Sequence, residues 1–435
     1  EMVIRDWSSD VCSSDLNRLF GEIVAGMKKC KELGKIPVSM AIDTWAVDYV
    51  LLDEKDQILG DTYGYRDHRT DGMDAEVAKI LPETELYGKT GIQKQIFNTV
   101  YQLMAVKQQT PELLQQAKTL LMLPDYFGFR LTGNKLSEYT NGSTTQLVNP
   151  DTFQWDKELI RKLGYPEDIF LPLQMPGTKV GQLLPEIQKE VGFDLEVVLC
   201  GSHDTASAVM AVPQTEGDGI YISSGTWSLM GIESLKPVIT EDAAAANFTN
   251  EGGYDHRFRF LKNIMGLWMI QSVRHEYNDA YSFAQLCDMA EESKEFPSRV
   301  DVNDQSFLSP DSMVEAIRQY CHKTGQPVPE SVGELTSVVY RSLAQSYGET
   351  VRGLEKIAGK TYDSIHIIGG GSNAAYLNQL TADATGKTVY AGPGEATAIG
   401  NLLAQMIHAG DLADLKSARK CVRESFEIKT FAPAK

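Results

Sequence analysis

The sequence predicts an α/β protein of two domains with a cleft between them. Its 435 residues exceed what one small domain needs and suit two. Each half contains a short apolar run that leads into a turn rich in Asp, Ser or Gly, at residues 195–205 and 364–373. A helical pattern follows each turn, and this order of strand, turn and helix is typical of α/β folds.

Composition and charge exclude several classes of protein. Charged residues make up 23% of the chain and hydrophobic residues 42%, which fits a globular protein rather than a disordered or fibrous one. No apolar run approaches the ~18 residues of a membrane span, so we expect no membrane partner. The formal charge of −18 argues against binding of nucleic acid as the main role. A single anionic ligand stays compatible, because backbone amides can hold it without a net positive charge.

The six cysteines are scattered along the chain and include no C-x-x-C pair. This spacing predicts neither a disulfide framework nor a zinc site. Because free cysteines suit a reducing compartment, we predict a cytoplasmic location. His68 and His203 stand too isolated in the sequence to indicate a metal centre, so we predict no metal ligands.

The beginning of the chain combines an irregular segment with a clear helical pattern. Residues 1–16 have no hydrophobic periodicity and contain Ser-Ser-Asp twice, so we interpret them as a non-native or disordered leader. From residue 17 to 34, apolar residues recur at helical spacing and predict an amphipathic helix. Residues 38–42, 49–52 and 57–60 are predicted to be consecutive antiparallel strands.

The next segments are predicted from apolar periodicity and from helix breakers. Residues 75–135 are expected to be mostly helical, with one apolar face made by Leu113, Leu114, Ala117, Leu120 and Leu121. Residues 145–190 are rich in proline and polar residues, which predicts a loose segment or several short helices.

The second half of the chain repeats the pattern of strand, turn and helix. A buried strand at 195–200 leads to a helix at 206–212, and a polar stretch at 213–219 predicts a boundary between domains at 17–213 and 214–435. A strand hairpin is predicted at 219–231. A mostly helical region then ends in a strand at 364–368, a glycine turn, a helix at 374–385 and a strand at 388–390.

Asp204 is the sharpest candidate for chemistry. It lies between an apolar strand and an apolar helix, which places it at the carboxyl end of a strand, where open α/β sheets bind their ligands. A carboxylate in this position can accept a proton from a substrate hydroxyl. The alternative is that Asp204 or Thr205 merely caps the helix.

Two turns are candidates for binding phosphate through backbone amides. Residues 223–226, Ser-Ser-Gly-Thr, form the predicted hairpin turn, and Gly369-Gly370-Gly371 joins a strand to a helix. Neither turn contains G-x-x-x-x-G-K-[ST] or G-x-G-x-x-G, so a tight turn without ligand is the alternative for each. Residues 65–70 are predicted to be a solvated charged face. Further candidates to line a sugar or a base are Trp45, Asn263, Trp268 and Gln271, although most tryptophans simply pack.

Several segments together resemble the FGGY carbohydrate kinases. They are DTWAVDY at 43–49, YRDHRT at 65–70, GSHDTASAV at 201–209, SSGTWSLMG at 223–231, LKNIMGLW at 261–268 and the glycine turn at 369–371. The resemblance runs from about residue 17 to near the end of the chain. It implies two actin-like (ribonuclease H-like) ATPase domains with an interdomain cleft, which close on a ketose and on ATP with Mg²⁺.

The resemblance also implies roles for individual residues. Asp204 would be the general base that takes the proton of the C1 hydroxyl of the sugar. The positions that would contact the ketose are Ala46, His203, Thr205 and Asn263, with Ala46 standing where the family more often has Gly. The positions that would bind the nucleotide are Thr226, Gln271, Gly369 and Gly370. No contact follows for Arg66 and Asp67, although both belong to a motif.

The implied activity is transfer of the γ-phosphate of ATP to the 1-hydroxyl of L-rhamnulose, because the segments around Asp204 and Trp227 are most similar to family members that act on this sugar. The alternatives are the same chemistry on another ketose, such as L-fuculose or D-xylulose, and an inactive sugar-binding regulator. A sugar hydrolase is disfavoured, since no pair of carboxylates emerges. Residues 1–16 do not match the D-x-G-x-x-S-G-R phosphate loop that opens the family. We therefore expect the first strands and this loop to be missing, and phosphoryl transfer to be impaired in the chain as written.

Overall fold

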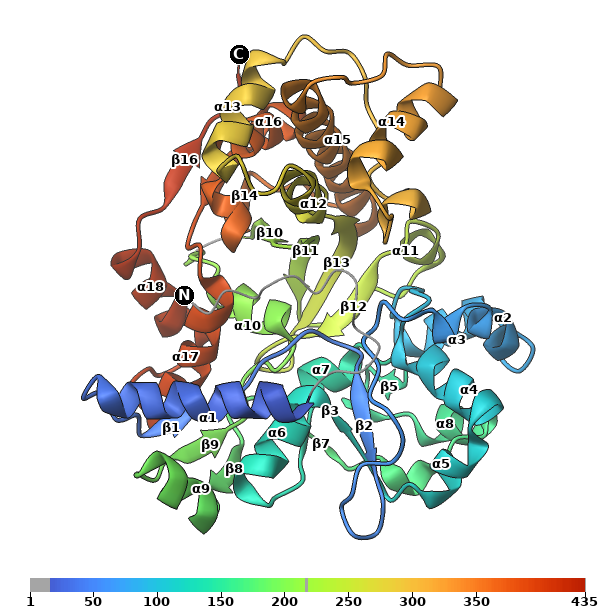
Figure 1. The fold of residues 1–435 in the computed structure, drawn as a ribbon, viewed down its shortest axis with the longest axis vertical. Helices are drawn as coiled ribbons and strands as arrows, with labels where there is room; N and C mark the ends of the chain where they lie inside the picture. The colour runs from blue at the N-terminus through green and yellow to red at the C-terminus, as the bar shows by residue number, and fades with distance from the viewer. Residues whose placement is uncertain (1–15, 216–217, 435) are drawn as a thin grey trace. The chain divides into compact units, whose positions relative to one another are not determined.

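The computed structural model describes residues 16–215 and 218–434 (Figure 1). The chain divides into two compact units. The first consists of Glu1–Ser207, Ser234–Arg259 and Gly400–Ala413, and the second of Ala208–Glu233, Phe260–Ile399 and Asp414–Lys435. The predicted domain limits at 17–213 and 214–435 stay a prediction. Apart from Leu16, the leader interpreted at residues 1–16 lies outside the described residues.

The first unit begins with the predicted amphipathic helix, α1 (Leu16–Glu32). Its buried positions recur every three or four residues at Leu16, Phe20, Val24 and Met27. They join a hydrophobic cluster to which α9 (Pro185–Val191) also contributes buried side chains. This packing fixes α1 in the first unit (Figure 1).

Three strands form the sheet that positions the site in the first unit. They are β1 (Ser39–Met40), β9 (Glu196–Val198) and β8 (Lys179–Gln182), in the order β1-β9-β8. β1 runs parallel to β9, whereas β8 runs antiparallel to β9. The chain therefore leaves β1 and β9 at the same edge of this sheet.

β2 (Tyr49–Leu52) belongs to a different sheet, where it pairs antiparallel with β3 (Thr119–Met122). The predicted antiparallel pairing of β1 with β2 is wrong, because each strand pairs with a segment far along the chain. Only the last part of that prediction holds, since Leu52 forms an antiparallel bridge with Ile58.

β3 also corrects the helix predicted through Leu121. α5 (Pro111–Gln116) ends before these leucines, and Leu120 and Leu121 lie in β3. Leu120 belongs to one hydrophobic cluster and Leu121 to another, because successive side chains of a strand point to opposite faces. A strand buried on both faces produces a continuous apolar run, which resembles the spacing of a buried helix.

The rest of the first unit consists of short helices and strands. Within residues 145–190 the short helices agree with the prediction, whereas the short strands were not predicted. The helices are α2 (Met73–Ala78), α3 (Glu83–Thr90), α4 (Thr99–Gln109), α6 (Leu123–Thr132), α7 (Tyr139–Ser143), α8 (Lys157–Leu163) and α11 (Glu241–Ala245), with 3₁₀ turns η1 (His68–Thr70) and η2 (Glu167–Ile169). The strands are β4 (Ser137–Glu138), β5 (Val148–Asn149), β6 (Gln154–Trp155), β7 (Leu173–Gln174) and β12 (Thr249–Gly252).

The strands of the second unit lie in one seven-stranded sheet in the order β12-β13-β11-β10-β14-β15-β16, in which β12 is the edge strand beside β13. Their bounds are β10 (Ile220–Ser224), β11 (Trp227–Ser234), β13 (Phe258–Met265), β14 (Ser364–Ile368), β15 (Thr388–Ala391) and β16 (Lys429–Phe431). β10 and β11 form the predicted hairpin, and the predicted strands at 364–368 and 388–390 are confirmed as a parallel pair.

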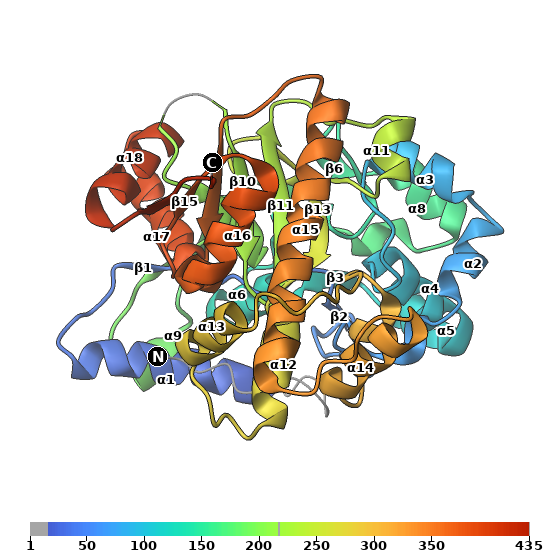
Figure 2. The ribbon, with the colours of Figure 1, turned by 90° about the horizontal axis from the view of Figure 1, so that it is seen from above.

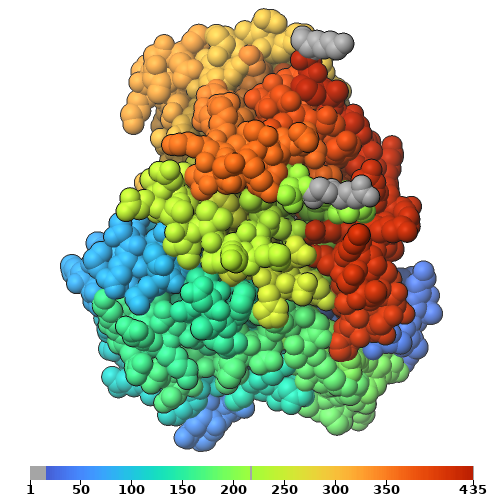
Figure 3. Space-filling view, turned by 180° about the vertical axis from the view of Figure 1, so that it is seen from behind, coloured from blue at the N-terminus to red at the C-terminus, as the bar shows by residue number. Residues whose placement is uncertain are grey.

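The longest helix of the second unit, α15 (Val332–Ala358), packs against α13 (Phe283–Glu292) and α16 (Ala375–Thr385). Figure 2 shows α15 with α16 beside it, and Figure 3 shows the surface formed by this part of the chain, in orange. The remaining elements are α12 (Trp268–Glu276), α14 (Met313–Lys323), α18 (Leu415–Ser425), η3 (Gln305–Phe307) and η4 (Gly370–Asn373). α10 (Asp204–Met210) and α17 (Ala396–Ala409) contribute residues to both units.

No helix within residues 16–215 and 218–434 combines the length and the apolar character that crossing a membrane requires.

Candidate functional site

The loops after the parallel strands β1 and β9 run side by side. The Thr44 amide donates to the Ser202 carbonyl at 2.9 Å, and the Asp204 amide donates to the Thr44 carbonyl at 2.9 Å. Thr44 and His203 also form a parallel bridge beyond the ends of the strands. Asp204 therefore follows the carboxyl end of β9 and opens α10, in the position that the sequence predicts. The structure places Ala46 and His203 in these two adjacent loops, and Asp204 and Thr205 in the first turn of α10.

The Asp204 carboxylate has one occupied oxygen and one open oxygen. Its Oδ1 accepts a hydrogen bond from Thr205 Oγ1 at 3.1 Å and lies 3.4 Å from His203 Nε2. Its Oδ2 accepts no hydrogen bond from the described residues, and the side chain is 47% exposed. No described backbone amide donates to the side chain of Asp204 or Thr205, so helix capping does not account for this pair. Oδ2 is thus open to a ligand hydroxyl.

His203 is held by two buried charged residues that the sequence analysis missed. Arg259 Nη2 lies 2.9 Å from His203 Nδ1 and 3.0 Å from Glu251 Oε2. Arg259 is fully buried, and Glu251 is 5% exposed. Burial opposes ionisation of Glu251, but Arg259 and His203 outweigh it and hold the pKa of this carboxyl below its ordinary value. The available signal was an arginine within the apolar strand Phe258–Met265.

Asp43 places a second carboxyl next to this pair of loops. Asn401 Nδ2, from α17, donates to Asp43 Oδ2 at 2.6 Å. Burial raises the pKa of Asp43 to about 7; the charge of Asp204 acts in the same direction, and the bond from Asn401 opposes it. Asp43 lies within the motif at 43–49, but the sequence indicated no role for its side chain.

Ala46 lies at a tight turn with an unusual backbone. The Asp48 amide donates to the Ala46 carbonyl at 3.0 Å, and Val47 between them has a φ of 68°. A β-branched residue in this region costs on the order of 1–3 kcal/mol and persists only where its surroundings hold it. Thr99 Oγ1 holds it by donating to the Val47 carbonyl at 2.7 Å. The Ala46 N–H has no hydrogen-bond acceptor among the described residues, which suits the expected backbone contact with a ligand.

Asp48 joins two of the motifs through its buried carboxylate. It accepts hydrogen bonds from Trp45 Nε1 at 2.6 Å, from the Tyr65 amide at 3.0 Å and from Gln102 Nε2 at 3.1 Å. Burial raises the pKa of Asp48 to about 7, although these bonds and the charge of Arg69 oppose the shift. The indole of Trp45 is therefore fixed by the same carboxylate that anchors the second motif.

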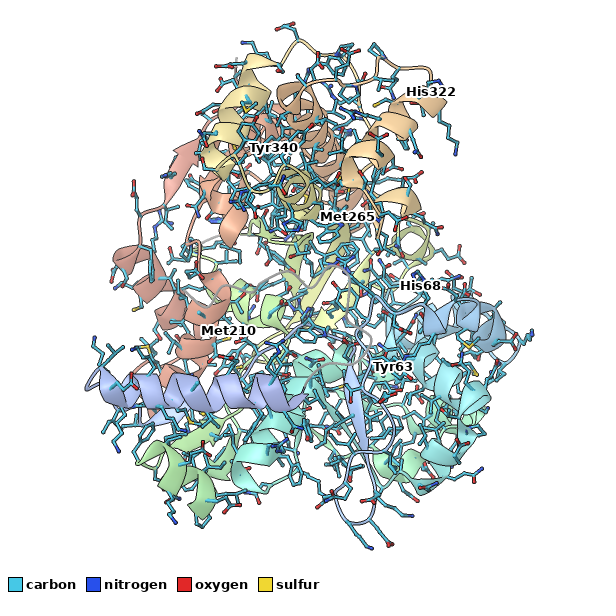
Figure 4. The ribbon with its side chains drawn as sticks, in the orientation of Figure 1. Tyr63, His68, Met210, Met265, His322 and Tyr340 are labelled. Atoms are coloured by element: carbon cyan, nitrogen blue, oxygen red, sulfur yellow. The ribbon has the colours of Figure 1, made fainter. Side chains whose placement is uncertain are left out.

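The segment at 65–70 is half-buried rather than a wholly solvated face. Asp67 Oδ1 accepts a hydrogen bond from the Arg69 amide at 2.8 Å and so caps η1. The Arg69 guanidinium lies 4.2 Å from the ring centroid of Tyr63, which Figure 4 labels together with the exposed His68. Arg66 lies 5.2 Å from the ring centroid of Tyr65. These contacts give Arg66 and Asp67 structural roles in the loop.

Glu138 fastens the loop that precedes His203 to the start of α7. This buried carboxylate accepts from Ser202 Oγ at 2.5 Å and from Thr140 Oγ1 at 2.6 Å through Oε2, and from the Thr140 amide at 2.7 Å through Oε1. Burial raises the pKa of Glu138, and the bonds from Ser202 and Thr140 work against the shift. No motif surrounds Glu138, so its role could not be predicted from the sequence.

In the second unit, the two predicted phosphate-binding turns lie at one edge of the sheet. β10 and β14 are parallel, with Ser223 opposite Ile368, so the turns that follow them are adjacent. Gly369 has a φ of +83°, and a Cβ there would lie 2.9 Å from the Ser224 carbonyl. Gly370 is exposed, and a Cβ there would meet nothing within 4 Å. The glycine turn therefore packs on Ser224 while its second residue stays open.

The beginning of α12 contacts the hairpin turn that contains Thr226. The Trp268 amide donates to the Thr226 carbonyl at 3.1 Å, and Gln271 lies almost one turn further along α12. Thr226, Gly369 and Gly370 thus lie in turns that follow the neighbouring strands β10 and β14, and Gln271 lies in the helix whose start contacts the first of these turns. Asn263 lies in β13, and its Oδ1 is buried without a hydrogen-bond partner among the described residues. It belongs to the second unit, whereas the other ketose-binding candidates belong to the first.

Both halves of the chain match models of one family. Residues 8–211 match the N-terminal domain of the FGGY family of carbohydrate kinases, and residues 220–409 match its C-terminal domain.

Curated relatives resemble the chain over nearly its whole length. It is 53% identical to a rhamnulokinase of Halalkalibacterium halodurans, an alignment that covers 97% of this chain and 90% of that protein. It is 46% identical to a rhamnulokinase of Bacillus subtilis, and that alignment covers 97% of this chain and 87% of that protein.

Solved structures of sugar kinases share the fold. The ligand-bound xylulose kinase of Lactobacillus acidophilus superposes with a TM-score of 0.79 at 17% identity, covering 97% of this chain and 85% of that one. Plasmodium falciparum glycerol kinase with ADP gives a TM-score of 0.74 at 14% identity, and the superposition covers 97% of this chain and 86% of that one. Together with the family models, these similarities confirm the predicted α/β fold of actin-like (ribonuclease H-like) domains. The chain therefore belongs to the FGGY family of carbohydrate kinases.

Proposed function

We propose that the chain transfers the γ-phosphate of ATP to the 1-hydroxyl of L-rhamnulose, giving L-rhamnulose 1-phosphate and ADP. The two rhamnulokinases at 53% and 46% identity support this choice of sugar. In the reaction, the bond between O1 and phosphorus forms as the bond to the ADP oxygen breaks, and the O1 proton passes to a base. Since such transfer depends on positioning and charge, the protein contributes a base and a binding site for each substrate.

The observation that carries the proposal is the asymmetric environment of Asp204. Thr205 Oγ1 donates to Oδ1 at 3.1 Å, and the His203 ring faces the same oxygen at 3.4 Å. Oδ2 is left without a partner among the described residues on a side chain that is 47% exposed. In this proposal Oδ2 accepts the proton of the C1 hydroxyl, while Thr205 fixes the orientation of the carboxylate.

The ketose is proposed to contact Ala46 through its amide and Thr205 through its hydroxyl. It is proposed to pack against the ring of His203, whose two nitrogens face Arg259 and Asp204. Asn263 is proposed as a further ketose contact, because its buried Oδ1 lacks a hydrogen-bond donor among the described residues. Ala46, Thr205 and Asn263 each offer a donor or an acceptor, as recognition of a polyhydroxylated sugar requires.

The nucleotide is proposed to bind at the turns of the second unit. Thr226 and Gln271 supply polar side chains, and Gly369 and Gly370 supply backbone that adenosine or the α-phosphate can approach closely. We propose Mg²⁺ as the ion that accompanies ATP. Residues 16–215 and 218–434 contain no group of three or more His, Cys, Asp or Glu side chains that could hold a metal ion, so we assign Mg²⁺ no protein ligand and no step.

The test is ADP release with Mg-ATP against L-rhamnulose, L-fuculose, D-xylulose and glycerol. It uses the chain as written and a second chain that begins with the D-x-G-x-x-S-G-R phosphate loop of the family. Preferential turnover of L-rhamnulose by either chain supports the proposal, and preference for another ketose replaces the sugar but keeps the chemistry. Binding of L-rhamnulose without ADP release from either chain overturns it in favour of a sugar-binding regulator.

The cytoplasmic location stays a prediction that rests on the scattered cysteines, as does the absence of a nucleic-acid partner, which rests on the net charge.

A further inference from the structure

The buried pair of Arg259 and Glu251 has no direct role in the proposed phosphoryl transfer. Arg259 is fully buried and Glu251 is 5% exposed. A buried ion pair is weak evidence for stability, because the free energy of desolvation can exceed the attraction between the charges. Both side chains nevertheless converge on a single neighbour, the imidazole of His203.

The hairpin of β12 and β13 fixes the direction of the guanidinium. Arg259 Nε donates to the Gly252 carbonyl at 2.9 Å, across the hairpin. The Gly252 amide in turn donates to Ser143 Oγ, at the end of α7, at 2.8 Å. Nη2 is then left to point at His203 Nδ1, 2.9 Å away, and at Glu251 Oε2, 3.0 Å away.

This contact determines which ring nitrogen of His203 carries the proton. A guanidinium has only donors, so the nitrogen that faces it must offer a lone pair. Nδ1 of His203 also lies 3.4 Å from Glu251 Oε2, but the guanidinium nitrogen is closer, at 2.9 Å, and can only donate. The shorter contact therefore favours Nδ1 as the acceptor, with the ring proton on Nε2. Nε2 is the nitrogen that lies 3.4 Å from Asp204 Oδ1.

We propose that Arg259, held in place by Glu251, is a positioning residue that fixes His203 in the Nε2–H tautomer, so that the ring donates toward Asp204 Oδ1. The opposite tautomer would turn a lone pair toward the carboxylate and an N–H toward the guanidinium. With Nε2–H and the Thr205 hydroxyl both directed at Oδ1, the proton of the sugar has only Oδ2 to occupy. The catalytic part of this inference rests on the proposed function, whereas the tautomer does not.

The first test reads the tautomer directly on the free, unmodified protein. The seven histidines are labelled with ¹⁵N, and the ring of His203 is assigned by the signals lost in His203→Gln. Long-range ¹H–¹⁵N correlations are expected to show a protonated Nε2 and an unprotonated Nδ1. A protonated Nδ1, or exchange between the two tautomers, overturns the proposal. No sugar or ATP is present in this test, so a protein without kinase activity can still show the expected tautomer. Failure of the tautomer proposal is therefore distinguishable from failure of the proposed function.

The second test removes both buried charges together, in Glu251→Gln with Arg259→Met, so that neither is left unpaired. The His203 ring is expected to sample both tautomers. We expect kcat to fall about 10- to 100-fold, less than the ~10²–10⁴-fold that loss of a general base costs, because Asp204 itself is kept, with KM for ATP unchanged. Arg259→Lys keeps a hydrogen-bond donor beside His203. This single variant is therefore expected to keep most of the kcat of the unmodified protein, unlike the double variant.

The matched control is Glu233→Gln with Arg419→Met, which removes another largely buried ion pair, in the second unit. An unchanged His203 spectrum and unchanged kcat in the folded Glu251/Arg259 double variant overturn the proposal. An equal loss of kcat in the control has the same effect, since it would reduce the role of Arg259 to general stability.

Discussion

Asn401 donates through Nδ2 to Asp43 Oδ2 at 2.6 Å, across 358 residues of sequence. The bond joins the first turns of α17 to the loop after β1, and both residues belong to the first unit. Asp43 is one residue from Thr44, whose backbone pairs with Ser202 and Asp204. A protonation change at Asp43 therefore occurs directly beside the proposed base.

We expect Asp43→Asn to change how stability depends on pH. Burial raises the pKa of Asp43 from 3.8 to about 7, so the folded protein holds this proton more tightly than the unfolded chain does. The stability from Asp43 is fully present below about pH 4 and is lost as the pH rises to about 7. The amide that this substitution introduces would keep the bond from Asn401 without titrating. As the pH rises, the free energy of unfolding of the variant should therefore increase relative to that of the unmodified protein. The difference should reach up to a few kcal/mol, since each pKa unit is worth about 1.4 kcal/mol.

The measurement is the thermal midpoint of both proteins from pH 4.5 to 8. Asp363→Asn, at an exposed position of the second unit, is the matched control and should follow the unmodified protein. Asp48 also has its pKa raised to about 7, but it is present in all three proteins and cancels in the comparison. Parallel curves for Asp43→Asn and the unmodified protein would contradict the buried, proton-holding state of Asp43.

Asp204→Asn is expected to abolish most of the turnover while leaving the site intact. An amide oxygen can still accept from Thr205 Oγ1, but the side chain can no longer take a proton from the sugar. We expect kcat to fall by about 10²–10⁴, with little change in KM for the ketose or in the thermal midpoint. Steady-state ADP release against L-rhamnulose measures this, with Asp363→Asn as the control. Full activity in Asp204→Asn would remove Asp204 from the role of base.

Substitutions at Gly370 and Gly369 should distinguish an effect on nucleotide binding from an effect on folding. A Cβ at Gly370 meets no atom within 4 Å, so Gly370→Ala should fold normally and raise KM for ATP because the methyl group intrudes on the nucleotide. Gly369→Ala requires a φ of +83° and places its Cβ 2.9 Å from the Ser224 carbonyl, so it should also lower the thermal midpoint. An unchanged KM for ATP in Gly370→Ala would place the nucleotide elsewhere.

Glu138→Gln should loosen the loop that carries His203. The amide group offers one acceptor oxygen where the carboxylate offers two, so a donor from Ser202 or Thr140 loses its partner. Loss of one hydrogen bond to a buried charged group costs about 1.5–3 kcal/mol, and we expect a lower thermal midpoint with reduced kcat. Glu186→Gln, which changes an exposed glutamate of α9, is the control and should change neither. A stable and fully active Glu138→Gln would show that Ser202 is held by other contacts.

Local patterns predicted the elements whose partners lie nearby in the sequence. α1 and the hairpin of β10 and β11 were predicted because their apolar spacing and turn residues are local signals. β1 was assigned to the wrong partner, since its pairing with β9 joins segments that lie far apart in the sequence, as Ser39 and Glu196 do. Leu120 and Leu121 were assigned to a helix because a strand buried on both faces lacks the alternation that marks an exposed one.

The candidate site divides in the same way. Asp204 could be predicted because it follows a strand and precedes a helix, and its neighbours came with it. Glu138, Glu251 and Arg259 could not, since their roles arise from burial and from contacts with Ser202 and His203, which lie far from them in the sequence. A buried charge is visible only once the fold shows what surrounds it.

The discontinuous first unit has a consequence for synthesis on the ribosome. Its segment Gly400–Ala413 is made long after Ser207, because most of the second unit lies between them in the sequence. At about 5–20 residues per second, the translating chain waits roughly 10–40 s between these two parts. During that interval the Asp43 carboxyl is without its amide partner and the Ser207 carbonyl is without Gly400, where any Cβ would come within 1.7 Å. The nascent first unit therefore completes its packing around Asp43 and Ser207 only after α17 has left the ribosome.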